Sequence, residues 1–216
     1  MRVPYFKTLS QDDLLDPLAV GWSGVNSEHV PLTGTPVDMQ PTAYIRTKWK
    51  NQQPGRITRV RLKAMHNGET LAFHLQWAVP SKVSQTRKPG SFPDAAAIAF
   101  GTDGGSSFHT MGASGSPLNI WHWRADAINN GRQVTAAGIG TTEAYADRDV
   151  KASARQAGNG WQVVIARNFE SRNHDLKMGD RIKFAVAIWD GNSEERGGLK
   201  AYSPSPLTIN ISDEQV

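Results

Sequence analysis

The chain has 216 residues, 24 basic and 20 acidic side chains that give a formal net charge of +4, and no cysteine. Without cysteine the protein can form no disulfide, ligate no iron–sulfur cluster through thiolates and attach no haem covalently. The basic residues are scattered along the sequence, which argues against a nucleic-acid-binding surface. No stretch approaches eighteen apolar residues, so no membrane-spanning helix is expected.

The composition favours β structure. The 20 glycines and 12 prolines indicate many turns, and hydrophobic residues make up 38% of the chain. All-β sandwiches often reach this length without splitting into separate domains. We therefore predict a single domain over residues 1–216.

The N-terminal segment, residues 1–42, is rich in proline and is predicted to wrap around the domain mostly as loop. A short helix is predicted at 10–15, where Ser10 can cap the helix and Asp13 lies three residues further on. The first twenty residues contain no uninterrupted apolar stretch, so no signal peptide is recognised in the chain as given.

Alternating apolar and polar residues predict strands over 43–49 and 57–64. The sequence at 66–69 contains an Asn-Gly pair, which is typical of a tight hairpin turn, and alternation resumes over 71–77. A β-hairpin is therefore predicted around this turn.

An apolar run at 95–100 predicts a central strand, and a Gly/Ser-rich loop follows over 101–116. Further short strands, separated by Gly, Asn or Asp, are predicted at 118–124, 133–140, 150–155, 161–167, 182–189 and 207–211. About ten strands at these spacings are typical of an all-β fold, a two-sheet antiparallel β-sandwich with a few short helices in its loops.

One stretch of the chain combines several potential ligands. Residues 108–112 include His109 and Met111, and residues 117–126 include His122 between two tryptophans. A thioether and nitrogen ligands beside a wide aromatic surface are the groups that a buried haem requires. This stretch is therefore a candidate haem-binding region.

Strand alternation over 118–124 separates the side chains of this region into two faces. One face carries Leu118, Ile120 and His122, and the other carries Asn119, Trp121 and Trp123. A lone histidine on an apolar face is more often a hydrogen-bonded core residue than a ligand, and the sequence leaves His122 open. Methionine is ordinarily a flexible core filler, but a Gly/Ser loop is an unusual place for one, which favours Met111 as a ligand.

Motifs for other chemistry are missing from the sequence. The Gly-rich segment 101–107 lacks the Gly-Lys-Ser/Thr ending of a phosphate-binding loop, so a plain turn is expected there. The chain contains no H-E-x-x-H or G-x-S-x-G motif and no recognisable pair of catalytic carboxylates. No hydrolytic activity is predicted.

The segments 93–100 and 117–126, together with the Met111-Gly112 pair, resemble a known family. This family comprises the haem-b-binding γ subunits of periplasmic molybdenum oxidoreductases such as ethylbenzene dehydrogenase, dimethylsulfide dehydrogenase, chlorate reductase and selenate reductase. Segments 161–167 and 198–203 add to the resemblance, which spans roughly residues 43–212.

The resemblance implies one non-covalent haem b whose iron has a methionine and a lysine as axial ligands. These ligands map onto Met111 and Lys200, with His122 and His109 as reserve candidates. By itself Lys200 would be interpreted as a solvated surface residue, because it follows the loop-like sequence Arg196-Gly197-Gly198.

The resemblance also implies a non-catalytic electron-transfer subunit. Such a subunit would form a heterotrimer with a molybdopterin catalytic subunit and an iron–sulfur subunit, and would relay electrons between the iron–sulfur subunit and a soluble cytochrome c. The family implies a periplasmic location, with a signal peptide already cleaved or export together with a partner.

Two alternatives remain open at this level. The first is a haem-free module similar to a carbohydrate-binding domain, in which Trp121, Trp123 or Trp189 would stack on sugar rings. The second is a purely structural subunit that has kept the fold and lost the haem.

Overall fold

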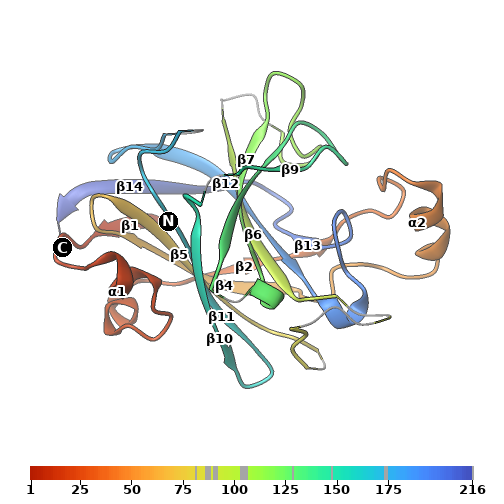
Figure 1. The fold of residues 1–216 in the computed structure, drawn as a ribbon, viewed down its shortest axis with the longest axis horizontal. Helices are drawn as coiled ribbons and strands as arrows, with labels where there is room; N and C mark the ends of the chain where they lie inside the picture. The colour runs from red at the N-terminus through yellow and green to blue at the C-terminus, as the bar shows by residue number, and fades with distance from the viewer. Residues whose placement is uncertain are drawn as a thin grey trace.

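The protein is built from two layers of β-strands that face each other across a hydrophobic core (Figure 1). The computed structural model describes residues 1–80, 82–85, 89, 92–102, 107–127, 129–146, 148–172 and 175–215. The predicted all-β sandwich with a few short helices in its loops is confirmed.

The first layer is an antiparallel sheet. Its strands come from the parts of the chain that precede and follow the candidate haem-binding region. In spatial order its strands are β10 (Lys151–Ala157), β11 (Gly160–Asn168), β5 (Thr70–Ala78), β4 (Arg59–His66) and β2 (Glu28–Pro31). The predicted hairpin corresponds to β4 and β5, whose register pairs His66 with Leu71.

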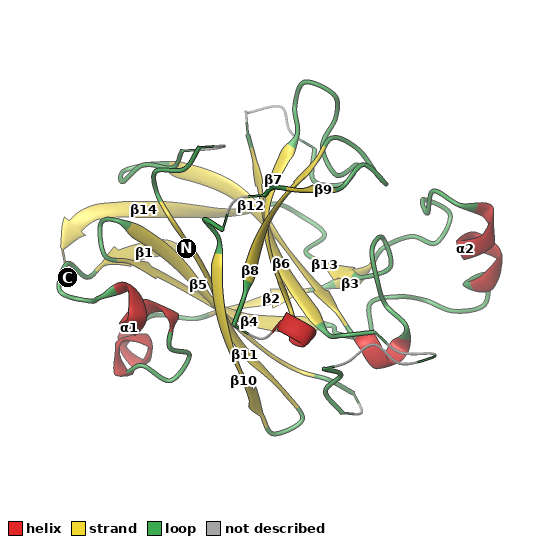
Figure 2. Ribbon diagram, in the orientation of Figure 1, coloured by secondary structure: helices red, strands yellow, loops and turns green. Residues whose placement is uncertain are grey.

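The second layer carries the region that the sequence singled out. Its strands, in spatial order, are β14 (Leu207–Gln215), β12 (Arg181–Trp189), β6 (Ala95–Gly101), β7 (Leu118–Arg124), β8 (Gly131–Ala136) and β9 (Glu143–Ala144). The short β13 (Ala201–Tyr202) pairs with β12 and with β3 (Thr33–Gly34). The helices, all short (Figure 2), are α1 (Gln11–Leu15), α2 (Ala43–Lys48) and the 3-10 helices η1 (Val20–Gly24), η2 (Ala125–Ala127) and η3 (Gly191–Ser193).

A parallel strand, β1 (Arg2–Tyr5), joins the two layers. It pairs with β14 through Arg2 and Asn210, and with β4 through Tyr5 and His66. The N-terminal segment therefore contributes strands as well as the predicted wrapping loop. No sequence pattern predicted β1, because a four-residue strand that includes a proline shows no alternation and depends on distant partners for its hydrogen bonds.

The predicted strand at 43–49 is wrong, because residues Ala43–Lys48 form helix α2. The Thr42 hydroxyl caps this helix by accepting a hydrogen bond from the Ile45 amide at 3.3 Å. The helix buries none of its residues, so the alternating pattern does not reflect a buried face. Figure 2 shows α2 on an arm that projects from the strand layers.

Aromatic side chains fill the space between the layers. The ring of Phe73 on β5 lies 5.5 to 5.9 Å from the rings of Phe100, Trp121 and Phe184, which come from the second layer. Trp123 on β7 makes an edge contact with Trp161 on β11 at 5.0 Å. Because each large aromatic removes 150–250 Å² from water, these contacts dominate the attraction between the layers.

The N-terminal segment covers the outer face of the first layer. The predicted helix is confirmed as α1, whose Ser10 and Asp13 form a reciprocal capping box. Leu14 of α1 and Trp22 of η1 pack in a second apolar cluster, together with Met65, Ala72 and Val164 from the strands. The outer face of the second layer is covered differently, by the loops described below.

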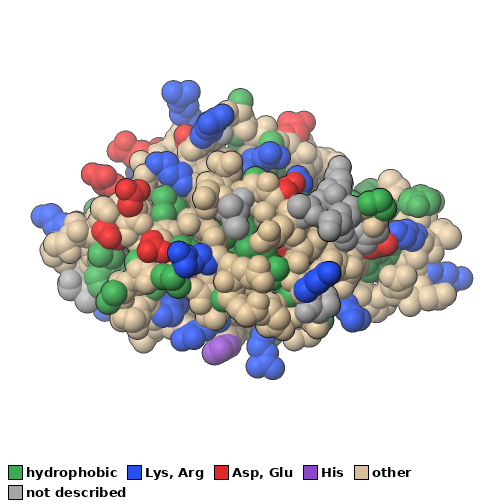
Figure 3. All heavy atoms as spheres, turned by 60° about the horizontal axis from the view of Figure 1, so that its bottom comes forward, with side chains coloured by type: hydrophobic (Ala, Val, Ile, Leu, Met, Phe, Trp, Pro, Cys, Tyr) green, Lys and Arg blue, Asp and Glu red, His purple; other side chains and the backbone are tan. Residues whose placement is uncertain are grey.

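The surface agrees with the charge pattern of the sequence. On the face drawn in Figure 3, lysine and arginine side chains are spread out and form no single continuous patch. Within the part of the chain that the structure describes, no helix is long and apolar enough to cross a bilayer.

Asp94, which directly precedes β6, is a buried carboxylate that ties several segments together. Its Oδ2 accepts hydrogen bonds from the Ser84 amide at 2.7 Å and the Trp161 Nε1 at 2.8 Å, and its Oδ1 accepts one from the Gly191 amide at 2.8 Å. Burial raises the pKa of this carboxyl group, and the three hydrogen bonds act in the opposite direction.

Replacing Asp94 by Asn is expected to lower the free energy of unfolding by about 3 kcal/mol, because an amide cannot accept at both of its positions and leaves buried donors unpaired. Urea denaturation monitored by tryptophan fluorescence measures the loss. The same change at Asp213, an exposed residue of β14, serves as the control and should have little effect. Equal stabilities of the two variants would contradict the anchoring role.

Candidate functional site

The outer face of the second layer presents a row of small side chains. Strand register places Ala95, Ala97 and Ala99 of β6 beside Trp189, Ala187 and Ala185 of β12. We call Ala95, Ala97, Ala99, Ala185 and Ala187 the alanine floor. An alanine projects only one carbon from the backbone, so the floor is a flat apolar surface of small side chains.

Strand β7 continues this outer face and confirms the predicted alternation. Leu118 and Ile120 belong to the apolar cluster on the outer face, whereas Trp121 and Trp123 belong to the core between the layers. Met111 and Phe108 pack against the same outer cluster from the loop that precedes β7. The two tryptophans are therefore packing residues of the core and do not line the site.

Two of the sequence-predicted site residues meet above the alanine floor. The Lys200 Nζ donates a hydrogen bond to the Met111 Sδ at 3.1 Å, although the two residues are 89 positions apart in the chain. The same nitrogen lies 5.4 Å from the centre of the Trp189 ring, which is within the range of a cation–π contact. The fold thus brings together the thioether and the amine.

The environment of Lys200 is unusual for a lysine. Its side chain is only 7% exposed, and burial lowers the pKa of its amine from 10.5 to about 8. Among the described residues its amine donates only to the Met111 sulfur, and a thioether is a weak acceptor. A buried amine with a lowered pKa loses its proton more easily, and only the neutral amine has a lone pair for a metal.

The backbone of Met111 is strained. Its φ is 61°, in the left-handed region that residues other than glycine seldom adopt. The Gly138 amide holds it there by donating to the Met111 carbonyl at 2.9 Å. Strain of this kind persists where the surrounding structure imposes it, and it is found most often at functional sites.

The position directly after Met111 requires a glycine, Gly112. Its φ is 80°, and a Cβ at this position would lie 2.5 Å from the carbonyl oxygen of Ala136. Only glycine therefore fits where the Met111 loop passes over the end of β8.

The loop that carries Lys200 is fixed by a buried carboxylate that the sequence did not reveal. Glu195 is fully buried, and its oxygens accept hydrogen bonds from the amides of Gly55, Arg56 and Asp190 at 2.7 to 3.0 Å. In the sequence, Glu195 stands in a charged run that is typical of a solvated loop. No local pattern could have identified its role, because its partners come from distant segments.

The N-terminal segment holds the main chain next to Lys200. The Thr35 amide donates to the Lys200 carbonyl at 3.0 Å, and the Thr35 hydroxyl donates to the Gly198 carbonyl at 2.6 Å. The Gln40 side chain donates to the same Gly198 carbonyl at 3.1 Å. Thr35 and Gln40 are thus positioning residues that the sequence analysis did not single out.

His122 lies on the same outer face as the alanine floor, directly opposite Ala97 in the register. Its ring makes an edge contact with Trp189 at 5.5 Å. Burial lowers the pKa of His122 to about 3, and the positive charges of Arg124, Arg132 and Lys200 add to this effect, so the imidazole is neutral at physiological pH.

His109, the other reserve candidate, is exposed on the turn before Met111. Within the described ranges no group of three or more His, Cys, Asp or Glu side chains is arranged to hold a metal ion. The donors around the alanine floor are therefore one thioether, one amine and one imidazole.

The tryptophans proposed for sugar stacking are buried. Trp121 and Trp123 are 0% exposed and Trp189 is 8% exposed, so none presents an open face to a sugar ring. Two surface hollows, one lined by Glu69 and Arg172 and the other by Asp12 and Arg155, include none of these tryptophans. The geometry therefore does not favour the carbohydrate-binding alternative.

Comparison with known proteins identifies sequence relatives. The family model described as ethylbenzene dehydrogenase matches residues 19–148 and 137–201. A putative respiratory nitrate reductase heme subunit of Haloferax mediterranei is 26% identical over 206 residues, which covers 94% of this chain and 70% of that protein.

Two further relatives are named as gamma subunits. The dimethylsulfide dehydrogenase subunit gamma of Rhodovulum sulfidophilum is 28% identical over 87% of this chain and 72% of its own length. The chlorate reductase subunit gamma of Ideonella dechloratans is 29% identical over 64% of this chain. In that case the match spans only 59% of the relative.

Solved structures with the same fold have little sequence in common with this chain. A family 9 carbohydrate binding module from Caldicellulosiruptor kristjanssonii, in complex with glucose, superimposes with a TM-score of 0.55 at 9% identity and covers 100% of this chain and 96% of its own. A putative carbohydrate-binding protein from Bacteroides uniformis gives 0.53 at 12% identity, with 100% and 92% coverage. At such identities the likeness shows the sandwich fold alone.

Replacing Lys200 by Met is expected to stabilise the haem-free protein below pH 8 by roughly 3 kcal/mol, which corresponds to the fall of the lysine pKa from 10.5 to about 8. Between these two pH values the unfolded chain binds more protons than the folded one, so the free energy of unfolding of the native protein rises with pH. The advantage of the variant should therefore vanish near pH 10.5. Urea denaturation across this pH range measures the difference in free energy of unfolding between the variant and the native protein. A variant with the exposed Lys183 changed to Met is the control. A difference that does not depend on pH would contradict the prediction.

Replacing Gly112 by Ala should destabilise the protein by at least about 2 kcal/mol more than replacing Gly115 by Ala. Both glycines have a positive φ in the same loop, but a Cβ at Gly115 has no heavy atom within 4 Å, whereas a Cβ at Gly112 meets the Ala136 backbone. The thermal unfolding midpoints of the two variants give the comparison. Similar midpoints would show that Gly112 is needed only for its backbone angle.

Proposed function

Because the chain belongs to the ethylbenzene dehydrogenase family, we propose that it is an electron-transfer subunit that binds one non-covalent haem b and catalyses no reaction itself. The observation that carries the proposal is the contact between the buried amine of Lys200 and the sulfur of Met111. A subunit named for its heme among the relatives supports the cofactor. The absence of cysteine limits any haem in this chain to non-covalent binding.

Met111 and Lys200 are the proposed axial ligands of the iron. The thioether is a neutral, soft ligand that favours ferrous iron and raises the reduction potential. The lowered pKa of Lys200 makes its neutral, ligating form easier to reach than that of a surface lysine. The two atoms lie in direct contact, so an iron ligated by both requires these unbranched side chains to move apart.

The rest of the site would hold the ring system and keep water out. The alanine floor offers a flat apolar surface, and Trp189 and Ile120 extend it on either side. Bound haem b would supply reversible one-electron chemistry. The protein's own residues would fix the ligands, through the strained Met111 backbone and the hydrogen bonds of Thr35 to the Lys200 loop.

The proposed partners follow from the relatives, which are named as subunits of larger reductases and dehydrogenases. We place the chain in a heterotrimer with a molybdopterin catalytic subunit and an iron–sulfur subunit. It would pass electrons between the iron–sulfur subunit and a soluble cytochrome c in the periplasm. A site on the outer face of the second layer, next to the loop that carries Met111, would suit exchange of electrons with neighbouring proteins.

Reconstitution of the purified chain with haemin tests the proposal. We expect a b-type pyridine haemochrome spectrum at one haem per chain. Replacing either Met111 or Lys200 by Ala should change the spectrum of the reduced protein, because one axial ligand is lost. Replacing the exposed His109 by Ala should leave that spectrum unchanged and is the matched control.

Two results would count against the proposal in different ways. The absence of any b-type signal in reconstituted protein would overturn haem binding itself. A larger spectral change in a His122→Ala variant than in the Met111→Ala variant would retain the haem and move the ligand assignment to the histidine.

A further inference from the structure

Two nitrogen-bearing side chains on the outer face of the second layer take no part in the contact between Lys200 and Met111. His122 on β7 lies directly opposite Arg132 on β8 in the antiparallel register. Their side chains therefore share the face that carries the alanine floor. Together they form one side of the site, next to β9.

Arg132 is exposed at the surface. No carboxylate of the described residues lies within ion-pair distance of its guanidinium. By contrast, Arg124 at the end of β7 pairs with Asp126 at 2.5 Å. A guanidinium presents several N–H groups in a plane that matches a carboxylate, so a free Arg132 is suited to bind one.

His122 is half-buried, and its ring lies on the face of the alanine floor, opposite Ala97. A neutral imidazole carries one N–H donor and one acceptor nitrogen. Its N–H can therefore donate to a ligand group placed on that face.

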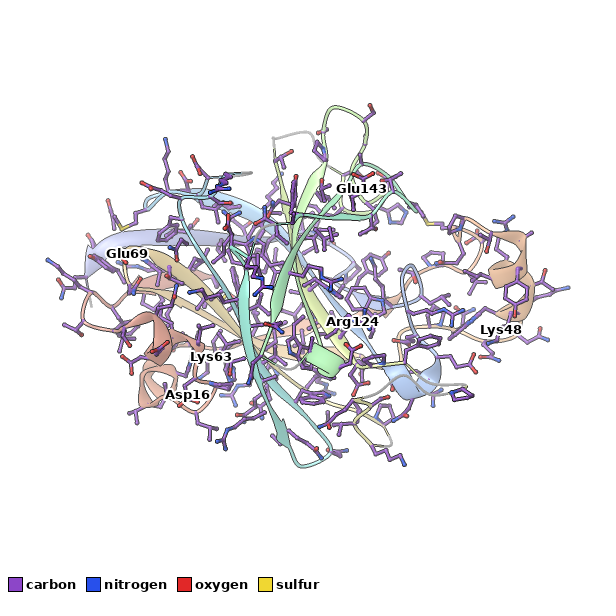
Figure 4. All side chains as sticks on the ribbon, viewed as in Figure 1. Asp16, Lys48, Lys63, Glu69, Arg124 and Glu143 are labelled. Atoms are coloured by element: carbon purple, nitrogen blue, oxygen red, sulfur yellow. The ribbon has the colours of Figure 1, made fainter. Side chains whose placement is uncertain are left out.

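Among the described acidic residues, Asp126 pairs with Arg124, and Glu143 of β9 lies opposite Thr135, a position of β8 that faces away from the side of Arg132. Figure 4 shows Glu143 well separated from Arg124 along the sheet. The positive charges of Arg124 and Arg132 both act on His122. The local field therefore favours an anionic group beside His122 and Arg132.

We propose that His122 and Arg132 form a carboxylate-binding subsite of the haem site, in which Arg132 pairs with a haem propionate and His122 donates a hydrogen bond to it. This inference rests on the proposed haem function. It gives His122 a role in orienting the cofactor in place of its reserve role as an axial ligand.

The experiment compares haemin with its dimethyl ester, in which both propionates are neutral. The native chain should bind haemin at least about tenfold more tightly than the diester, because a charge-assisted hydrogen-bonded pair contributes that much. An Arg132→Gln variant should lose about tenfold in affinity for haemin and keep its affinity for the diester. Fluorescence quenching of the tryptophans gives both dissociation constants.

Two controls separate this subsite from general effects. An Arg59→Gln variant removes an exposed arginine from β4, in the other layer, and should change neither affinity. A His122→Leu variant should weaken haemin binding and leave the spectrum of the reduced protein unchanged, because the iron keeps both ligands.

Each failure has its own meaning. Equal binding of haemin and the diester to the native chain, or an equal loss for both in Arg132→Gln, would overturn the subsite and leave the haem function standing. Failure of the native chain to bind either compound would overturn the proposed function and this inference together.

Discussion

The contact between the Lys200 amine and the Met111 sulfur is the constraint on which the rest of the site depends. Burying a charged lysine amine costs a large free energy unless the amine has strong hydrogen-bond or ion-pair partners. A thioether is only a weak hydrogen-bond acceptor. The fold nevertheless buries this amine and lowers its pKa to about 8. A buried, weakly paired amine of this kind is what the proposed role of Lys200 as an iron ligand requires.

Met111 and Lys200 are held in place by different kinds of interaction. Met111 is fixed by local geometry, because a left-handed backbone angle and the tight approach of Gly112 to Ala136 leave the loop one conformation. Lys200 is fixed by distant segments, since the buried carboxylate of Glu195 and the N-terminal Thr35 secure its loop. The N-terminal segment therefore helps to form the site as well as covering the first layer.

The division between the two faces of the second layer explains how a common sandwich fold can carry this site. The inner face is filled by large aromatic rings such as Trp121 and Phe100, which hold the layers together and leave no space. The outer face has alanines at the alternate positions of β6, so it is flat and carries only small side chains there. Alternation along one strand thus separates the residues that stabilise the fold from those that form the site.

The sequence by itself determined the sandwich, most strand positions, the faces of β7 and the choice of Met111, because these follow from alternation, turn residues and a short motif. The prediction from sequence was wrong at α2, where alternation occurs without burial, and it missed β1, a short strand that depends on remote partners. The pairing of Met111 with Lys200 came from family resemblance, and only the tertiary structure placed the two atoms in contact. The burial of Lys200 and the anchoring by Glu195 were also decided there, because each depends on segments that are far apart in the chain.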